Sequence, residues 1–226
     1  MRLLKLNHVL SAVLLAALPA LCATVEGKVT VPVVSESPAG AGGGYSRGVY
    51  RPSAKSSAGQ ETGKPGEALS FIIVWAEPLG KPAQFKAPAK NPAMIQRNKT
   101  FVPHVLPVQS GTTVDFPNLD PLYHNVFSYS RARRFDLGLY EQGKSKSVTF
   151  DQPGIIDVFC EIHESMHAYV LVLETPWFTR ASADGMYSLE LPAGDYRICT
   201  WIPSRHCEPV EIKLIQSSRE QVDFSF

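Results

Sequence analysis

The apolar positions of this chain are grouped in short runs that turn residues interrupt. Runs such as TTVDF, SVTF and IIDVF, within residues 100–160, are rich in β-branched and aromatic residues and are bounded by Pro and Gly. Several short strands at close spacing are typical of a β-sandwich or barrel. The same texture continues beyond Pro176, where Asp184-Gly185 indicates a turn. Because no segment has a convincing helical period, the pattern predicts an all-β protein.

Two regions near the N-terminus depart from this pattern. Residues 1–23 carry Arg2 and Lys5, then an apolar run, then small residues that end near Ala23. This arrangement is typical of a secretory signal peptide and is too short to span a bilayer. We therefore expect an exported protein, periplasmic or secreted, without a membrane span. Residues 35–66 are rich in Gly, Ser and Pro and lack an apolar period, which predicts a flexible loop.

The composition limits the possible partners. A chain of 226 residues, 44% of them hydrophobic, can bury one large core or two small ones. The formal net charge is +1, and the chain has no basic stripe with interleaved aromatic residues. Nothing in the charge pattern therefore favours nucleic acid as a partner.

The segment CEIHESMH, residues 160–167, contains two motifs that exclude each other. H-E-x-x-H, from His163 to His167, is the signature of zinc metalloproteases, in which one helical turn stacks both His side chains on the same face. Here the motif lies between the β-rich runs IIDVFC and AYVLVLE. On a strand the two rings would lie roughly 13 Å apart, too far to share an ion. We therefore disfavour the metalloprotease interpretation and expect a protein that is not an enzyme.

The alternative motif, C-x-x-H-x-x-M, places Cys160, His163 and Met166 in one short loop. A further histidine, His124, stands 36 residues before Cys160, at the entry of an apolar strand. Two His and one Cys in a trigonal set, with a weak axial Met, define blue-copper electron-transfer sites. The sequence therefore predicts one copper ion per chain, cycling between Cu(I) and Cu(II). His167 is the alternative axial ligand.

The runs GTTVDFPNLDPLYHNVF and SKSVTFDQPGIIDVFCEIHESMHAYVLVLETP resemble the cupredoxins, and the ligand loop is similar to that of amicyanin. With its flanks, the chain also resembles secreted bacterial proteins labelled methylamine utilization protein or plastocyanin-like protein. The resemblance implies a Greek-key β-sandwich over residues 99–175, with Asn125 tying the two ligand-bearing loops together. Glu164 stands where amicyanin-like loops carry Pro, and with Glu161 it predicts an acidic rim around the site.

The segment SADGMYSLELPAGDYRICTWI resembles carboxypeptidase regulatory-like, transthyretin-like sandwiches. Gly27-Lys28-Val29 and SFIIVWAE match the start of that pattern at the other end of the chain. The resemblance implies that residues 24–98 and 176–226 together form one Ig-like sandwich, into which the cupredoxin domain is inserted. Two domains that follow each other in sequence are the alternative. Because such sandwiches are usually structural or adhesive, this part predicts no chemistry.

The cysteines divide by expected role. Cys22 falls within the signal region, and Cys160 is the candidate metal ligand. Cys199 and Cys207 lie on either side of Pro203, and a hairpin centred there would bring them opposite each other. We therefore predict a disulfide between these two residues, which an oxidising compartment would maintain.

Two functions remain open. The first is a periplasmic carrier that moves one electron per cycle between a donor and an acceptor redox protein, through the edge of His163; the thiolate of Cys160 favours it, because thiolate ligation supports a reversible copper couple. The second is a copper-binding or copper-delivery protein, or a structural module with a drifted site. The acidic, His-bearing loop with Glu161, Glu164 and His167 favours the second. For His104 we expect a structural role on a strand.

Overall fold

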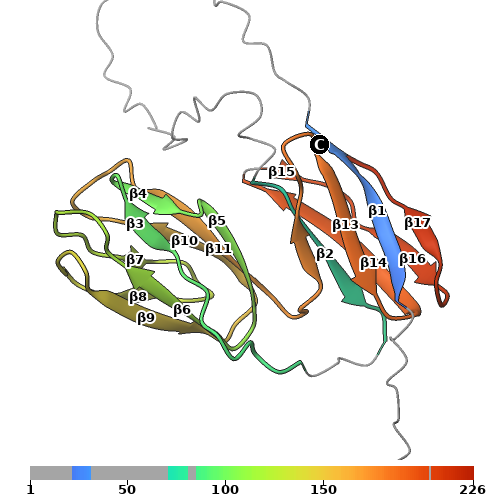
Figure 1. The fold of residues 1–226 in the computed structure, drawn as a ribbon, viewed down its shortest axis with the longest axis horizontal. Coiled ribbons are helices and arrows are strands. Elements are labelled where there is room, and N and C mark those ends of the chain that lie inside the picture. Colours follow the sequence, from blue (N-terminus) through green and yellow to red (C-terminus); the bar gives the residue numbers. More distant parts are fainter. Residues whose placement is uncertain (1–21, 32–70, 81–84, 204) are drawn as a thin grey trace, which may run out of the picture.

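The computed structural model describes residues 22–31, 71–80, 85–203 and 205–226, and every secondary-structure element in them is a β-strand (Figure 1). The predicted all-β fold class is confirmed. The strands form two sandwiches, which we call the inserted sandwich (β3 to β11) and the outer sandwich (β1, β2 and β12 to β18). The predicted flexible loop 35–66 lies outside the described residues. Among the described residues there is no helix that could cross a membrane.

The inserted sandwich consists of nine strands in two layers. These strands are β3 (Ile95–Arg97), β4 (Thr100–Val102), β5 (Val105–Gln109), β6 (Thr112–Pro117), β7 (Phe127–Ser128), β8 (Phe135–Asp136), β9 (Ser145–Phe150), β10 (Gly154–Phe159) and β11 (His167–Leu173). One layer is the sheet β5-β11-β10-β7-β8. The other contains the pairs β3–β4 and β6–β9, and the bridge between Gln96 and Asn118 joins β3 to β6.

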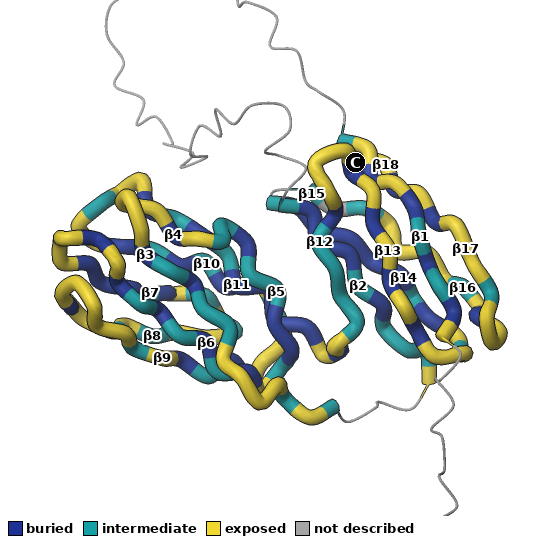
Figure 2. Tube along the Cα trace, viewed as in Figure 1, coloured by how far each residue is buried: buried dark blue, intermediate teal, exposed yellow. Residues whose placement is uncertain are grey.

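Apolar side chains at alternate positions fill the space between these layers. In β6 the side chains of Val114 and Phe116 are buried, and in β10 those of Ile156 and Val158 are buried, in one continuous core. The loops at the strand ends are largely exposed (Figure 2). The loop before β7 is an exception, because it buries His124, Asn125 and Val126 at one end of this core.

The outer sandwich uses strands from both ends of the described chain. These strands are β1 (Ala23–Thr30), β2 (Ile73–Pro78), β12 (Phe178–Arg180), β13 (Met186–Leu191), β14 (Gly194–Ile202), β15 (Arg205–His206), β16 (Val210–Leu214), β17 (Arg219–Gln221) and β18 (Phe224–Ser225). β1 lies between β13 and β17, and β2 lies between β12 and β14. In Figure 1, β1, drawn in blue, accordingly stands among the orange and red C-terminal strands.

The core of the outer sandwich forms between these two sheets. Val25 and Leu189 come from one sheet, and Val74 and Ile198 come from the other. β1 approaches the C-terminal segment so closely that a Cβ atom at position 27 would lie 1.8 Å from the carbonyl oxygen of Val222. Only glycine fits this approach, which explains Gly27 in the middle of a strand.

The two sandwiches pack against each other through a third apolar cluster. Its buried members come from β2, β5, β11 and β14 and are Ile73, Val105, Leu171, Leu173 and Trp201. The ring of Tyr169 contacts that of Trp201 at 5.3 Å, and the Arg180 guanidinium donates a hydrogen bond to the backbone oxygen of Val105. β11 therefore packs on both faces: Ala168, Val170 and Val172 face the inserted core, and Tyr169, Leu171 and Leu173 face the outer sandwich.

The boundaries of the two sandwiches differ from those expected. Met94 is fully buried in the inserted core, and the buried Gln96 bonds to Tyr140, so the segment before residue 98 already belongs to the inserted sandwich. At the N-terminus, β1 begins at the buried Ala23, which pairs with Leu191. The expected signal peptide, residues 1–23, falls almost wholly outside the described residues, and β1 begins at its expected last residue.

The predicted disulfide is wrong, because Cys199 and Cys207 are free thiols. β14 and β15 do form a hairpin, but its register pairs Ile202 with Arg205 and Trp201 with His206. Continued by one pair, this register would bring Thr200 opposite Cys207. The midpoint of the turn is therefore displaced by half a residue from Pro203, which shifts the pairing by one residue, and a slip of one residue sends a side chain to the other face of the strand. Cys207 accordingly lies on the face of the hairpin that packs against the outer core. Trp201 lies on the opposite face, which packs against the inserted sandwich.

Candidate metal centre

Three of the predicted ligand residues meet at one end of the inserted sandwich. The Sγ atom of Cys160 lies 3.7 Å from Nδ1 of His124 and 3.9 Å from Nδ1 of His163, and the two Nδ1 atoms are 3.1 Å apart. All three atoms lie within 4.8 Å of one another. Cys160 and His124 are buried and His163 is partly exposed. No other group of three such side chains meets in the described part of the chain.

The strand pairing explains why residues so distant in sequence meet here. β7 runs antiparallel to β10, and Phe127 pairs with Phe159. Residues just before β7 and just after β10 therefore reach the same end of the sheet. Asn125 strengthens this arrangement, because its Oδ1 accepts a hydrogen bond of 2.7 Å from the backbone N–H of Glu161. The two ligand-bearing loops are thus joined directly beside the cluster.

A buried carboxylate orients His124. Oδ2 of Asp120 lies 2.9 Å from Nε2 of His124, and the carboxylate also accepts the backbone N–H groups of Asn98 and Lys99 at 2.6 and 2.8 Å. Asn98 and Lys99 form the turn of the β3–β4 hairpin, with φ angles of 55° and 56°. Because Nε2–H donates to the carboxylate, the lone pair of Nδ1 faces Cys160 and His163.

The sequence interpretation did not identify Asp120. Its only signal in the sequence is an acidic residue four positions before His124, in the segment DPLYH. Burial by itself raises the pKa of Asp120, but the hydrogen bonds from Lys99, His124 and Asn98 outweigh burial and hold this pKa below its usual value. The carboxyl group is therefore ionised at neutral pH, as an acceptor for His124 requires.

The environment of His163 favours its neutral imidazole, which can donate a lone pair to a metal ion. Desolvation, followed by the charges of His124 and Lys99, lowers the pKa of His163. The neutral imidazole therefore predominates at neutral pH. Its backbone is fixed as well, since the N–H of Met166 donates to the carbonyl of His163 at 2.9 Å.

Met166 and His167 point in different directions. Met166 is 1% exposed and belongs to the same apolar core as Cys160. His167 is the first residue of β11, and its Nε2 lies 3.1 Å from Oδ1 of Asp157. Its ring stacks on Phe159 at 4.7 Å, outside the cluster. This placement argues against His167 as an axial ligand. It also argues against a shared zinc site with His163, since residues 160–167 contain no helix.

The rim of the cluster is more apolar than expected. Ile162, beside His163, is 48% exposed, and Leu122 and Tyr123, just before His124, are 42% and 57% exposed. Glu161 and Glu164 are exposed on the same loop as Ile162, as the expected acidic rim requires. The surface around His163 therefore combines apolar side chains with two carboxylates.

His104 lies in the bend between β4 and β5 and not on a strand as expected, but its surroundings agree with the expected structural role. Its ring contacts those of Phe71 at 4.7 Å and Tyr169 at 5.6 Å, and its backbone carbonyl accepts the N–H of Tyr169. His104 therefore belongs to the contact between the sandwiches.

Comparisons with known proteins found matches only among solved structures. No protein family and no curated protein matches the sequence. Among solved structures, the copper-containing nitrite reductase of Thermus scotoductus SA-01 is similar with 24% identity and a TM-score of 0.37, over 44% of this chain and 26% of that chain. A purple cupredoxin from Nitrosopumilus maritimus has 21% identity and a TM-score of 0.34, over 37% of this chain and 100% of that chain. A reduced amicyanin variant has 20% identity and a TM-score of 0.36, over 43% of this chain and 98% of that chain.

Proposed function

We propose that this protein is an exported, mononuclear type 1 copper protein that carries single electrons between two redox proteins. The observation that supports the proposal is the convergence of one buried thiol and two imidazole nitrogens within 4.8 Å. A soft thiolate with two imidazoles is the donor set that copper prefers in electron-transfer sites. A structural zinc site would require four ligands, usually with more than one thiolate.

The residues divide into ligands and supports. Cys160, His124 and His163 would hold the ion, and Met166, buried in the same core, is the candidate axial ligand. When bound, copper would supply a reversible Cu(II)/Cu(I) couple. Asp120 and Asn125 hold the ligand loops in place before the ion binds. Such prior organisation limits the rearrangement that accompanies a change in charge.

The surface around His163 is the candidate point of electron exchange. His163 is the only partly exposed member of the ligand cluster. Ile162, Leu122 and Tyr123 provide an apolar surface beside it, and Glu161 and Glu164 add negative charge. We infer a redox partner with an apolar contact area and basic residues at its edge, because charges at a rim steer encounter whereas apolar contact excludes water.

The test is a visible spectrum of the exported protein during Cu(II) titration. An intense thiolate-to-copper charge-transfer band that saturates at one copper per chain, bleaches on reduction and returns on oxidation is the expected result. Weak bands of a pale blue solution would instead support the copper-delivery alternative, in which the electron plays no part. No copper binding at all would support a structural module with a drifted site.

A further inference from the structure

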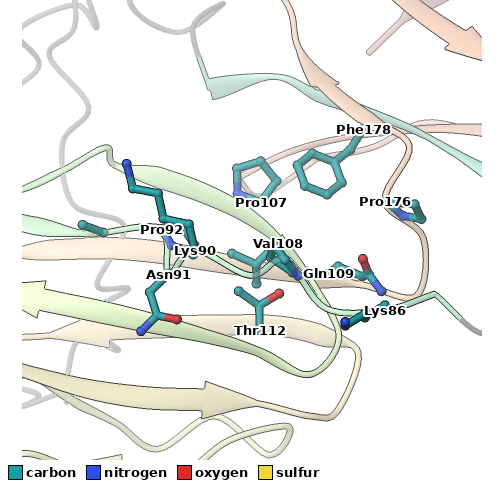
Figure 3. A pocket seen from close by; sticks show the side chains of 12 residues that line it. Lys86, Lys90, Asn91, Pro92, Pro107, Val108, Gln109, Thr112, Pro176 and Phe178 are labelled. Carbon is teal, nitrogen blue, oxygen red and sulfur yellow. The ribbon is translucent and has the colours of Figure 1, made fainter.

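A separate cavity of about 690 Å³ opens where the chain passes between the two sandwiches (Figure 3). Its walls come from the segment before β3, from β5 and β6, and from the start of β12 with the connection before it. The apolar part of the wall includes Pro92, Ala93, Pro107, Val108, Pro176 and Phe178. This volume lies within the range of small-molecule sites. Most of the wall is apolar, which suits a ligand with an apolar body.

A buried hydroxyl in this wall has no hydrogen-bond partner in the described part of the chain. Thr112 is 2% exposed, and its Oγ1 makes no hydrogen bond. Figure 3 shows this side chain in the wall of the cavity beside Gln109, with Lys86 and Lys90 on different sides of it. Leaving a buried hydroxyl unsatisfied costs about 1–3 kcal/mol. Because Oγ1 is itself covered, a ligand in the cavity reaches it only after the Thr112 side chain turns toward the cavity.

The charged side chains among the described residues that line the cavity are both positive. Lys86 and Lys90 are exposed, and neither forms an ion pair with any described residue. No acidic side chain is found among the described residues that line the cavity. Two unpaired ammonium groups beside an apolar wall complement a molecule that joins an anionic group to an apolar body.

We infer that this cavity binds an organic anion with an apolar body, such as a carboxylate or sulfonate. The ammonium groups of Lys86 and Lys90 contact the anionic group, and the hydroxyl of Thr112 donates a hydrogen bond to it once its side chain has turned toward the cavity. The prolines, Val108 and Phe178 cover the apolar body. The site is independent of the metal centre: Leu173, at the cavity end of β11, pairs with Gln109 and lies about 20 Å along the strand from His167.

The experiment compares two fluorescent dyes on the copper-free protein. 8-Anilinonaphthalene-1-sulfonate carries an anionic group on an apolar body, and N-phenyl-1-naphthylamine is its uncharged counterpart. We expect saturable binding of the anion at one site per chain, about three- to tenfold tighter than binding of the neutral dye, as two partly solvated ion pairs provide. Equal affinity for the two dyes, or no saturable binding, would overturn the inference.

Three variants locate the site. Lys86→Gln with Lys90→Gln should remove the preference for the anion, whereas the matched pair Lys144→Gln with Lys213→Gln, two lysines exposed elsewhere, should keep it. Thr112→Val should weaken anion binding, and Thr112→Ser should restore it. Ala93→Trp should fill the cavity and exclude both dyes. Unchanged dye binding in the Ala93→Trp protein, with an unchanged circular dichroism spectrum, would place the dye elsewhere and refute the proposal.

Discussion

The inserted and outer sandwiches are built from similar short strands, but they differ in the polar groups that they bury. Most buried polar residues belong to the inserted sandwich: Gln96, Gln109, Thr112, Asn118, Asp120, His124, Asn125 and Ser128. In the rest of the described chain only Thr175 and Thr200 are of this kind. Burying a polar group costs free energy unless it is hydrogen-bonded. The buried polar residues are therefore concentrated in the sandwich that holds the candidate sites. The outer sandwich buries few polar residues, which is typical of a structural support.

The buried polar residues near the cluster form a connected support. Nδ2 of Asn118 donates to the carbonyls of Leu122 and Tyr140, which fixes the loop that leads to His124. Nε2 of Gln96 donates to the hydroxyl of Tyr140. Burial, the largest influence, raises the pKa of Tyr140, so its hydroxyl stays protonated and can donate to the carbonyl of Phe116. Among these side chains, only Oε1 of Gln96 is buried without a hydrogen-bond partner in the described part of the chain, so the network is satisfied at its other atoms and favours one arrangement of the loop.

The largest expected difference between the sandwiches concerns the thiols. We expect Cys160→Ser to abolish the charge-transfer band of the copper-loaded protein completely, because oxygen is too hard a ligand for this site. The β-sheet circular dichroism signal should remain, since the change in volume is small. Cys199→Ser, at a buried position of the outer sandwich, is the matched control and should keep the band. A band that survives in the Cys160→Ser protein would refute the proposed ligand.

The next largest effect is expected at the carboxylate of Asp120, which we compare with an exposed carboxylate of the outer sandwich. Asp120→Ala removes the acceptor of three hydrogen bonds, and we expect the free energy of unfolding to fall by about 3 kcal/mol and the copper affinity to fall about 10- to 100-fold. Asp223, an exposed residue of the outer sandwich, accepts the backbone N–H of Lys28. Asp223→Ala should cost less than about 1 kcal/mol and leave copper binding unchanged. Chemical denaturation and copper titration measure both quantities; equal losses in the two variants would show that Asp120 has no special role at the site.

A smaller effect concerns the contact between the sandwiches. Burial, and then the charge of His167, lowers the pKa of His104 below its usual 6.5. In the pH range below 6.5 and above this lowered value, the unfolded chain binds more protons than the native protein, so native stability falls as the pH falls through this range. His104→Phe keeps an aromatic ring against Phe71 and removes the titration. Denaturation of the copper-free proteins at several pH values should show a shallower loss of stability on the acid side for His104→Phe; parallel curves would contradict this origin of acid sensitivity.

The smallest expected effect concerns the rate of thiol modification. Burial, the largest influence, and the charge of Glu77 raise the pKa of Cys199 to about 12, so its reactive thiolate is scarce at neutral pH. In the native, copper-free protein we expect Cys207, which is less buried, to react with iodoacetamide before Cys199. After denaturation without reductant, Cys160, Cys199 and Cys207 should all be alkylated. A linked pair at Cys199 and Cys207 in the mass spectrum would contradict the register of the β14–β15 hairpin.

Local patterns were sufficient for the chemistry of the candidate centre. The spacing of Cys160, His163 and Met166 can be read directly, because a short loop between two strands keeps such residues together whatever surrounds them. The distant His124 was also predicted from the sequence, but only the strand pairing explains why it meets them. The pairing of Phe127 with Phe159 brings His124 to Cys160, and the β3–β4 hairpin brings its backbone N–H groups to Asp120. Contacts of this kind leave no periodic signal in the sequence.

The sequence by itself determined the all-β class and the residue types that meet at the candidate centre, because both depend on the chemistry and spacing of neighbouring residues. Tertiary structure decided three further features: the register that separates Cys199 from Cys207, the assignment of Met94 to the inserted core, and the cavity around Thr112. Each depends on how one strand is placed against another. A shift of one residue, about 3.3 Å along a strand, reverses the face on which a side chain lies without changing the hydrophobic pattern enough to be recognised.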